Sequence, residues 1–349
     1  MTTTATTTTT NRVTRDFDKP LWRRVLLTRE SAIVGLLIVV VAFSMMTVRG
    51  FAQPITLNYL LLDIAPILLI ALPMALVMIT GEIDLSVGSM VGLASVVTGG
   101  AVHIGLPIEV AMLLALAVGV VGGAFNGFLV TVVGLPSLAV TIGTLALFRG
   151  LAVGILGTTA VTDFPETWTA LAKAKIAGTT IPYIMVPFLI LLVVFVLMLH
   201  FTPFGRGIFA IGQSKDAARF SGVNVERTKF ILFVLAGVIS AFAGIYYTLR
   251  FGSARGDNAT GLELQVIAAV VLGGVSVFGG RGQLYGVVAA VLLIGVLSSS
   301  LRLANITSDV IMVITGVLLI LSVVGASALN WLQSRRRRIN PLQVAATTA

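Results

Sequence analysis

Apolar segments long enough to cross a lipid bilayer follow one another from about residue 31 almost to the end of the chain. Lipid offers the backbone no hydrogen-bonding partner, so such segments have to be helical. A transmembrane barrel would need alternating polar and apolar residues, and these runs are continuous instead. We therefore predict an all-α integral membrane protein of about ten transmembrane helices, at 31–48, 58–79, 85–102, 108–133, 136–156, 182–201, 229–249, 262–279, 283–304 and 309–330.

Composition excludes several classes of function. Hydrophobic residues make up 57% of the chain and charged residues 11%, where soluble domains have about 25% charged residues. The chain has no cysteine, which excludes disulfides and Cys-based metal sites. His103 and His200 lie near predicted helix ends, far apart in sequence, so we expect neither a metal nor another cofactor. The net charge of +9 comes from residues at the ends of apolar runs rather than along one face, and binding to nucleic acid is therefore rejected.

The basic residues also predict an orientation. Most of the 23 lysines and arginines fall on one side if the N-terminus is cytoplasmic, as the positive-inside rule requires. Both termini are then cytoplasmic, with a disordered basic tail at 1–30, a transmembrane domain at 31–330 and a basic tail at 331–349. The long loop 157–181 becomes periplasmic, and the loop 202–228 cytoplasmic.

Two features of the spans concern their local shape. Pro66 and Pro73 are expected to kink or locally break the second span. Glycines in the fourth and eighth spans are expected to permit close helix packing. The segments 81–97 and 274–292 both place a glycine-rich break between apolar runs, a weak internal similarity that does not by itself establish a repeat.

The cytoplasmic loop contains a short helix signal. Ser214 can cap a helix whose first turn holds Asp216 and whose end holds Arg219, and Gly222 is a typical terminator. A helix of this length is not stable alone. It therefore needs either a protein partner or the headgroup region of the membrane, and the residues alone do not choose between these.

No energy source is visible in the sequence. The Gly-x-x-x-x-Gly-Lys-Ser/Thr loop that cradles nucleotide phosphates is absent, and no nucleophile–base constellation is present, so we expect a transport subunit rather than an enzyme. An ion-coupled transporter would need titratable groups within the membrane, and that remains the main alternative, with a passive channel or a membrane-embedded enzyme as a third. The candidate carboxylates all lie near predicted span ends, where helix capping is their simplest role: Asp63, Glu82, Asp84, Glu109, Glu263 and Asp309.

Four long segments, in order, resemble one known family. They are GEIDLSVGSMVGLASVV at 81–97, GLPSLAVTIGTLALFRGLAVGI at 134–155, FGRGIFAIGQSKDAARFSGVNVERTKF at 204–230, and the stretch from Gly261 to Leu297. Together they resemble the permease subunits of bacterial ATP-binding-cassette (ABC) sugar importers of the branched-chain amino acid/ribose/xylose/rhamnose class. The resemblance runs from about residue 31 to residue 326.

The resemblance implies a fold of the type II (vitamin B12 permease-like) importer class in the bacterial inner membrane. It also implies cytoplasmic ABC ATPase subunits, a periplasmic or lipid-anchored sugar-binding protein, and a second permease subunit, either identical or a close paralogue. In such permeases the loop before the seventh span carries the helix that couples the subunit to its ATPase. Here that helix corresponds to Ser214, Lys215, Asp216, Ala217, Ala218, Arg219, Phe220, Ser221 and Gly222.

The predicted mechanism is import of a monosaccharide by alternating access. Asn126, Ser137, Thr141 and Arg149 are plausible lining residues of the path, because polar groups in a bundle usually face its interior. Hydrogen bonding between helices is the equally plausible alternative for these four.

Two stretches bear on the individual protein. Many family members have Gly-Gly-Ile-Asp where this chain has Gly81-Glu82-Ile83-Asp84, so Glu82 is an additional carboxylate at the predicted cytoplasmic edge. The stretch RFGSARGDNATGLEL at 250–264 resembles rhamnose-type and autoinducer-type members more than ribose permeases.

Overall fold

The computed structural model describes residues 29–157, 159–307, 309–311, 313–314, 316–317 and 320. The predicted C-terminal tail, nearly all of the predicted N-terminal tail and more than half of the predicted tenth span lie outside these residues. Within the described part of the chain every regular element is a helix, and β structure is limited to two isolated bridges. The predicted all-α class is confirmed to that extent.

Twelve helices follow one another in the described residues. They are α2 (Arg29–Thr47), α3 (Pro54–Ile79), α4 (Val87–His103), α5 (Ile108–Thr131), α6 (Ser137–Leu156), α7 (Glu166–Lys173), α8 (Met185–Phe201), α9 (Pro203–Gln213), α10 (Lys215–Phe220), α11 (Val225–Phe251), α12 (Leu262–Leu272) and α13 (Leu284–Leu303).

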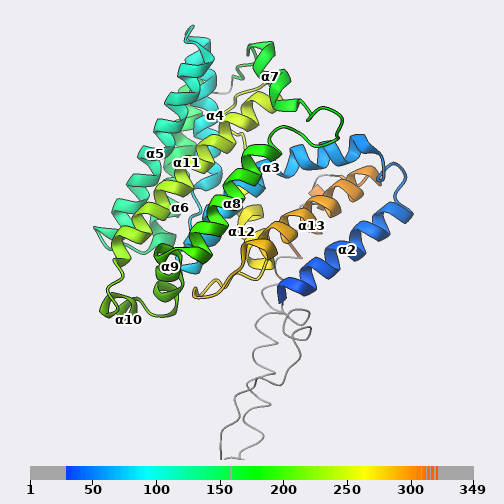
Figure 1. The fold of residues 1–349 in the computed structure, drawn as a ribbon. Helices are drawn as coiled ribbons and strands as arrows, with labels where there is room; N and C mark the ends of the chain where they lie inside the picture. Colours follow the sequence, from blue (N-terminus) through cyan, green and yellow to red (C-terminus); the bar gives the residue numbers. More distant parts are fainter. Residues whose placement is uncertain are drawn as a thin grey trace, which may run out of the picture.

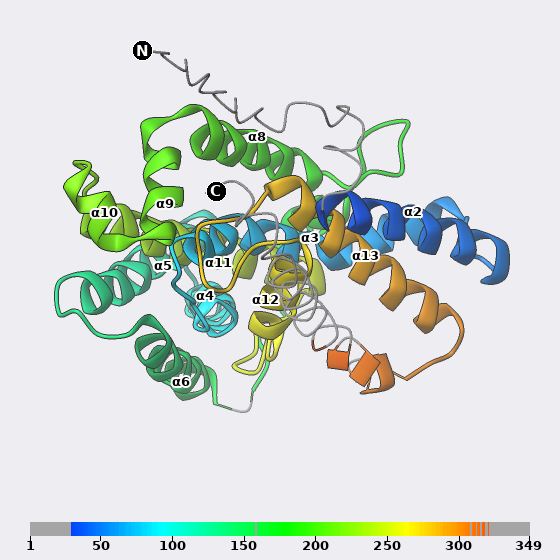
Figure 2. The ribbon, with the colours of Figure 1, turned by 90° about the horizontal axis from the view of Figure 1, so that it is seen from below.

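The central helix is α3. Every residue from Ile64 to Ile79 is buried, as expected for a helix that is apolar on all sides. The helix runs through Pro66 and Pro73 without ending, so neither proline breaks it. In Figure 2, α4, α5, α6 and α11 lie towards one end of α3 and α2 and α13 towards the other, with α12 between them.

Five of the described helices, α3, α5, α6, α11 and α13, are long and apolar enough to cross a membrane. The pair α8 and α9, bent by 69°, makes a sixth candidate. The helices α2, α4 and α12 are apolar but shorter, so the count of ten spans stays a prediction.

The predicted span 262–279 is wrong in its second half. The helix α12 ends at Leu272, and at about 1.5 Å per residue it is too short to cross a bilayer. The residues that follow form turns in which Gly274, Gly279 and Gly280 have positive φ angles of 93°, 84° and 74°. Hydropathy reads this segment as a continued span because glycine is not polar, whereas its backbone cannot continue the helix.

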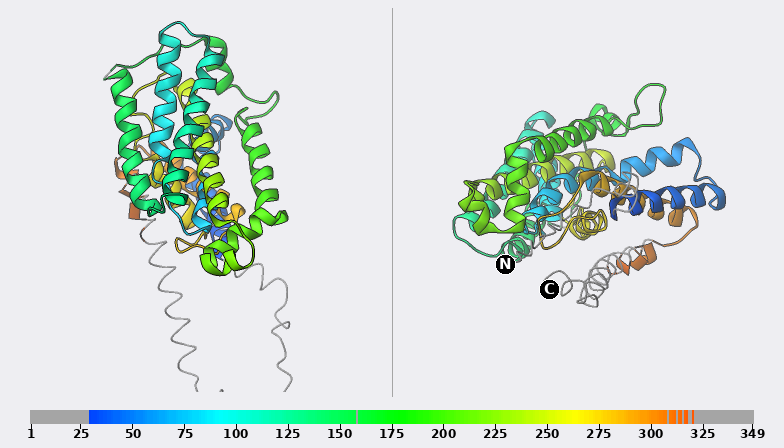
Figure 3. Two further views of the ribbon diagram at one scale, coloured as in Figure 1. Left: turned by 90° about the vertical axis from the view of Figure 1, so that its left-hand side faces the viewer. Right: turned by 60° about the horizontal axis from the view of Figure 1, so that its bottom comes forward.

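The two long loops lie at opposite ends of the bundle. Figures 1 and 3 place α10 at the lower end and α7 at the upper end. The upper loop is held by a β-bridge between Val161 and Ala254. This separation is the one that the charge pattern predicts for loops on different faces of a membrane.

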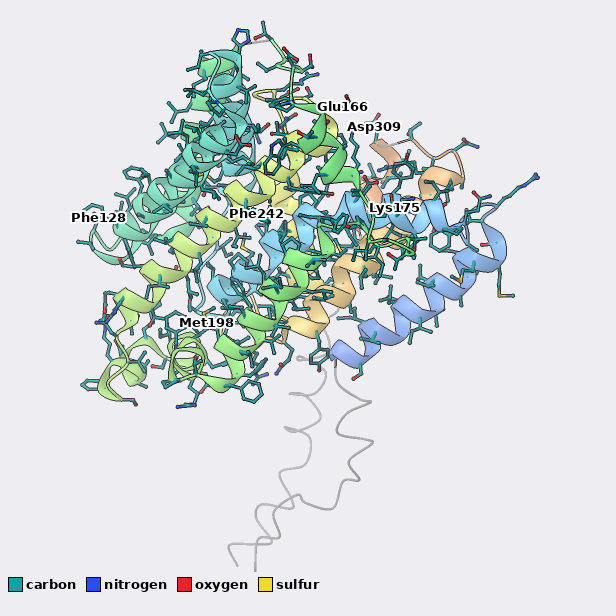
Figure 4. All side chains as sticks on the ribbon, turned by 45° about the horizontal axis from the view of Figure 1, so that its top comes forward. Phe128, Glu166, Lys175, Met198, Phe242 and Asp309 are labelled. Atoms are coloured by element: carbon teal, nitrogen blue, oxygen red, sulfur yellow. The ribbon has the colours of Figure 1, made fainter. Side chains whose placement is uncertain are left out.

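The outer helices expose apolar side chains. Phe128 of α5, which is 47% exposed, projects from the edge of the bundle (Figure 4). Leu113, Ile142, Leu189, Ile190 and Val193 are likewise exposed on α5, α6 and α8. An apolar surface of this extent is expected to face lipid rather than water.

Candidate functional site

The predicted short helix is present as α10. Its six residues lie within the predicted range. The hydroxyl of Ser214 accepts a hydrogen bond from the Ala217 amide at 3.3 Å, and Gly222 follows with a φ of 82°. Both the predicted cap and the predicted terminator are therefore confirmed.

Few contacts hold α10 on the bundle. Ala218 is buried with Ile211 and Val225 in a small apolar cluster. Arg219 forms an ion pair with Glu226 at the start of α11. Phe220, by contrast, is 92% exposed, so α10 presents a large apolar side chain at the lower edge of the molecule.

A bend of 69° between α8 and α9 precedes α10. Thr202 accepts a hydrogen bond from the Gly205 amide at 3.1 Å and donates one to the Met198 carbonyl. Pro203 occupies the first turn of α9, where it needs no hydrogen-bonding partner. A Cβ at Gly205 would collide with the backbone at the end of α8, so the close approach of α8 and α9 requires glycine.

The end of α9 touches two other segments through backbone atoms. The Gly280 amide donates to the Ile79 carbonyl at 2.8 Å, which joins the turn after α12 to the end of α3. Gly212 of α9 packs directly on this bond: a Cβ there would lie 2.9 Å from the Cα of Gly280 and still closer to the Ile79 carbonyl. We call this contact of Ile79, Gly212 and Gly280 the glycine junction.

Next to the glycine junction, one buried carboxylate binds two lysines. The side chain of Glu82 is 9% exposed, and its Oε1 lies 2.5 Å from the Nζ of Lys229 and 3.0 Å from the Nζ of Lys215. Burial tends to raise the pKa of Glu82, but hydrogen bonds from Lys229 and Ser137 and the charge of Lys229 outweigh it, and the pKa is lowered. The carboxylate is therefore ionised at neutral pH.

The four residues predicted to line the path make hydrogen bonds to turns and loops of the bundle. Asn126 donates to the Ser86 hydroxyl at 2.8 Å, and Thr141 donates to the Ile83 carbonyl at 3.2 Å. Ser137 accepts from the Ile83 amide at 3.3 Å. These three residues surround the turn between α3 and α4, and this turn is the segment 81–86 of the sequence motif.

The fourth, Arg149, lies apart from the other three. It donates to the carbonyls of Gly256 and Asn258 at 2.9 Å and 2.7 Å, and so holds the loop before α12. The five hydrogen bonds of these four residues join helices to a turn or a loop, and a role in the path stays a prediction.

Sequence reasoning missed a largely apolar cavity beside α3, whose wall includes five polar side chains. Its volume is about 420 Å³, and it lies between faces of α3, α12 and α13. The lining residues recur every three or four positions on each helix: Leu60, Asp63, Ile64 and Ile67; Gly261, Leu264, Gln265 and Ala268; Ile294, Gly295, Ser298, Ser299 and Arg302, with Ile311 and Gly316 beyond them. The available signal in the sequence was Ser298, Ser299 and Arg302, which share one face of α13.

Asp63 was expected to cap a helix, and that expectation is wrong. It lies within α3, where it pairs with Arg250 of α11 and, at 3.1 Å, with Arg302 of α13. Arg250 also donates to the Leu62 carbonyl at 2.9 Å. The carboxylate therefore joins three helices at the wall of the cavity.

Two other carboxylates lie near helix starts, as expected. Asp84 accepts from the amide and the hydroxyl of Ser86 at 2.9 Å and 2.6 Å. Glu109 lies in the first turn of α5. Within the described residues, no group of three or more His, Asp or Glu side chains could hold a metal ion.

Comparison with known proteins gives the family. The family model described as "Branched-chain amino acid transport system / permease component" matches residues 56–323. The chain belongs to this permease family. It is a transport subunit and not an enzyme, and the several apolar helices agree with a multi-pass membrane permease.

Relatives of this permease extend along nearly its whole length. The autoinducer 2 import system permease protein LsrD of Photorhabdus laumondii is 38% identical over 309 residues, which cover 85% of this chain and 91% of the relative. The protein of the same name from Escherichia coli strain K12 is 37% identical over 330 residues, covering 90% and 98%. No solved structure matches the permease significantly.

Proposed function

We propose that this permease is the membrane-spanning subunit of an ATP-driven importer for a small sugar-like solute, and that it works by alternating access. The observation that carries the proposal is α10, a capped helix at one end of the bundle that exposes Phe220 and begins three residues after Gly212 of the glycine junction. An exposed aromatic side chain on a helix that cannot be stable alone is a suitable docking point for another protein.

The proposed assembly has two permease subunits, identical or paralogous, above two cytoplasmic ABC ATPase subunits. A periplasmic or lipid-anchored binding protein delivers the solute. The lower end with α10 is then cytoplasmic, and both termini lie on that side of the inner membrane. The positive-inside distribution of lysine and arginine supports this orientation.

Autoinducer 2 is the first substrate to test, because the curated relatives are named as permeases of autoinducer 2 import systems. Ribose and rhamnose are the alternatives. An ATPase drives transport only if it binds one conformation of the bundle more tightly than the other. Contacts between the ATPase and α10 are where this difference in affinity would arise.

Reconstitution tests the proposal. The permease, its candidate ATPase and any partner permease are placed in liposomes with ATP on the ATPase side, and uptake of labelled autoinducer 2 from the binding protein is followed. Uptake that requires both ATP and the ATPase is expected. Uptake by the permease alone, driven by a proton or sodium gradient, would instead favour the ion-coupled alternative.

In the same experiment, F220E is expected to weaken association with the ATPase by about tenfold or more, since loss of an interface anchor costs about 2 kcal/mol or more. The measurement is co-purification of the ATPase at a series of concentrations. L171E is the matched control, because Leu171 is also exposed but lies on α7 at the opposite end. Equal ATPase binding by F220E and the wild type would contradict docking through α10.

We further propose that the solute passes the cavity beside α3, where Asp63, Gln265, Ser298, Ser299 and Arg302 offer donors and acceptors to hydroxyl groups. Q265L, which keeps the size of the side chain, is expected to raise the KM for uptake about tenfold, since a lost hydrogen bond costs about 1–2 kcal/mol. L264M, on the same cavity wall, should leave KM unchanged. An unchanged KM for Q265L would remove this cavity from the path.

A further inference from the structure

Glu82 lies where three segments meet, namely the turn between α3 and α4, the start of α10 and the start of α11. It belongs to the turn between α3 and α4. Lys215 is the first residue of α10, and Lys229 lies in the first turns of α11. A single carboxylate oxygen contacts both ammonium groups, so one side chain connects the turn to α10 and to α11.

The two ion pairs of Glu82 differ in burial. The side chain of Lys229 is 7% exposed, so its pair with Glu82 is protected from water. The side chain of Lys215 is 55% exposed, and exposed ion pairs are worth less than about 1 kcal/mol. The ion pair with Lys229 of α11 is therefore the stronger one. The ion pair with Lys215 of α10 can break and re-form at a small cost in free energy.

The turn that carries Glu82 is itself fixed to the bundle. The adjacent residue, Ile83, is bound through its amide and its carbonyl by Ser137 and Thr141 of α6. Ser86, at the start of α4, accepts from Asn126 of α5. A displacement of Glu82 therefore reaches α4, α5 and α6 through direct hydrogen bonds.

We propose that Glu82 is a positioning residue that transmits movement of α10 to the membrane helices, with Lys215 as the releasable contact and Lys229 as the permanent one. The inference rests on the proposed function, because α10 is taken as the point where the ATPase acts. The pair between Lys215 and Glu82 holds α10 in one position relative to the turn. When this pair is absent, α10 moves without the turn, and ATP hydrolysis is then less tightly coupled to the membrane helices.

The test uses K215Q, which removes the exposed ion pair with Glu82. The buried pair of Glu82 and Lys229 stays intact, so that folding is preserved. In proteoliposomes of the complete complex, K215Q is expected to retain ATP hydrolysis but to hydrolyse at least about threefold more ATP per solute imported. K215R keeps the positive charge and should restore the wild-type ratio. K173Q on α7 is the matched control, since Lys173 is exposed at the opposite end.

A second measurement does not depend on transport. The chain has no cysteine, so S221C and V133C place two spin labels cleanly, one just after α10 and one in the loop between α5 and α6. In the permease without its partners, K215Q is expected to broaden the distance distribution between the labels, and E82Q to broaden it at least as much.

The outcomes are distinguishable. Suppose that the variants broaden the distance distributions but the wild-type complex shows no ATP-driven uptake. This result would overturn the proposed function and would still support the connection of α10 to the turn through Glu82. Unchanged distances, or an unchanged ratio of ATP to solute in both K215Q and E82Q, would overturn the role of Glu82.

Discussion

Replacement of Gly237 by valine is expected to prevent the permease from assembling in the membrane. Gly237 lies on α11 where this helix crosses α5, and a Cβ there would lie 2.8 Å from the Cα and 2.9 Å from the amide nitrogen of Gly123. Gly119, Gly123 and Gly127 form a stripe on α5, four residues apart, that packs against α11. Small residues at this spacing allow two helix backbones to approach closely in lipid.

The expected loss is large because the neighbours are backbone atoms. Overpacking in a core usually costs about 1–3 kcal/mol when side chains can adjust, and a backbone has no alternative rotamer. Extraction in mild detergent followed by gel filtration should recover about one tenth or less of the wild-type monodisperse protein. G143V on α6 is the control, since nothing lies within 4 Å of a Cβ at Gly143. Wild-type recovery of G237V would show that the α5–α11 contact is not as close as described.

Replacement of Gly212 by alanine is expected to abolish ATP-driven uptake. The added methyl group would collide with the Ile79 carbonyl and with Gly280, and so separate the two segments that the hydrogen bond between them joins. A buried backbone bond that is lost costs about 1–3 kcal/mol, and the end of α9 would have to move away from α3. Movement of α10 would then no longer reach the central helix.

Uptake in cells and the amount of protein in the membrane should be measured together. We expect uptake to fall at least about tenfold more than the amount of protein does. G207A is the control on the same helix, because a Cβ at Gly207 would meet only the side chain of Val223, at 3.2 Å. If G212A and G207A transport equally well, the glycine junction does not carry the coupling.

Local features of the permease could be predicted from the sequence. The apolar run of α3 is buried on all sides, and α10 begins and ends at its predicted cap and terminator. Each of these features depends on residues within one or two turns of one another. The family resemblance, which also rests on continuous segments, is confirmed by the match to residues 56–323.

Features that depend on distant residues could not be predicted. Glu82 and its partner Lys229 are 147 positions apart, and Asp63 and Arg250 are 187 apart. A capping role for Asp63 followed from its place near a predicted span end, and the structure instead has α3 begin earlier, at Pro54. The early end of α12 was missed for a different reason. Hydropathy counts the glycines that follow this helix as apolar, whatever their backbone conformation.

The glycine junction separates two tasks that a coupling element has to perform. Contacts between Ile79, Gly212 and Gly280 involve main-chain atoms, whereas α10 exposes the side chain of Phe220. Under the proposed function, a permease could therefore change its ATPase by altering a few exposed positions of α10, while the glycine junction stays the same. Chimeric permeases that carry a foreign α10 should accordingly accept the foreign motor without redesign of the bundle.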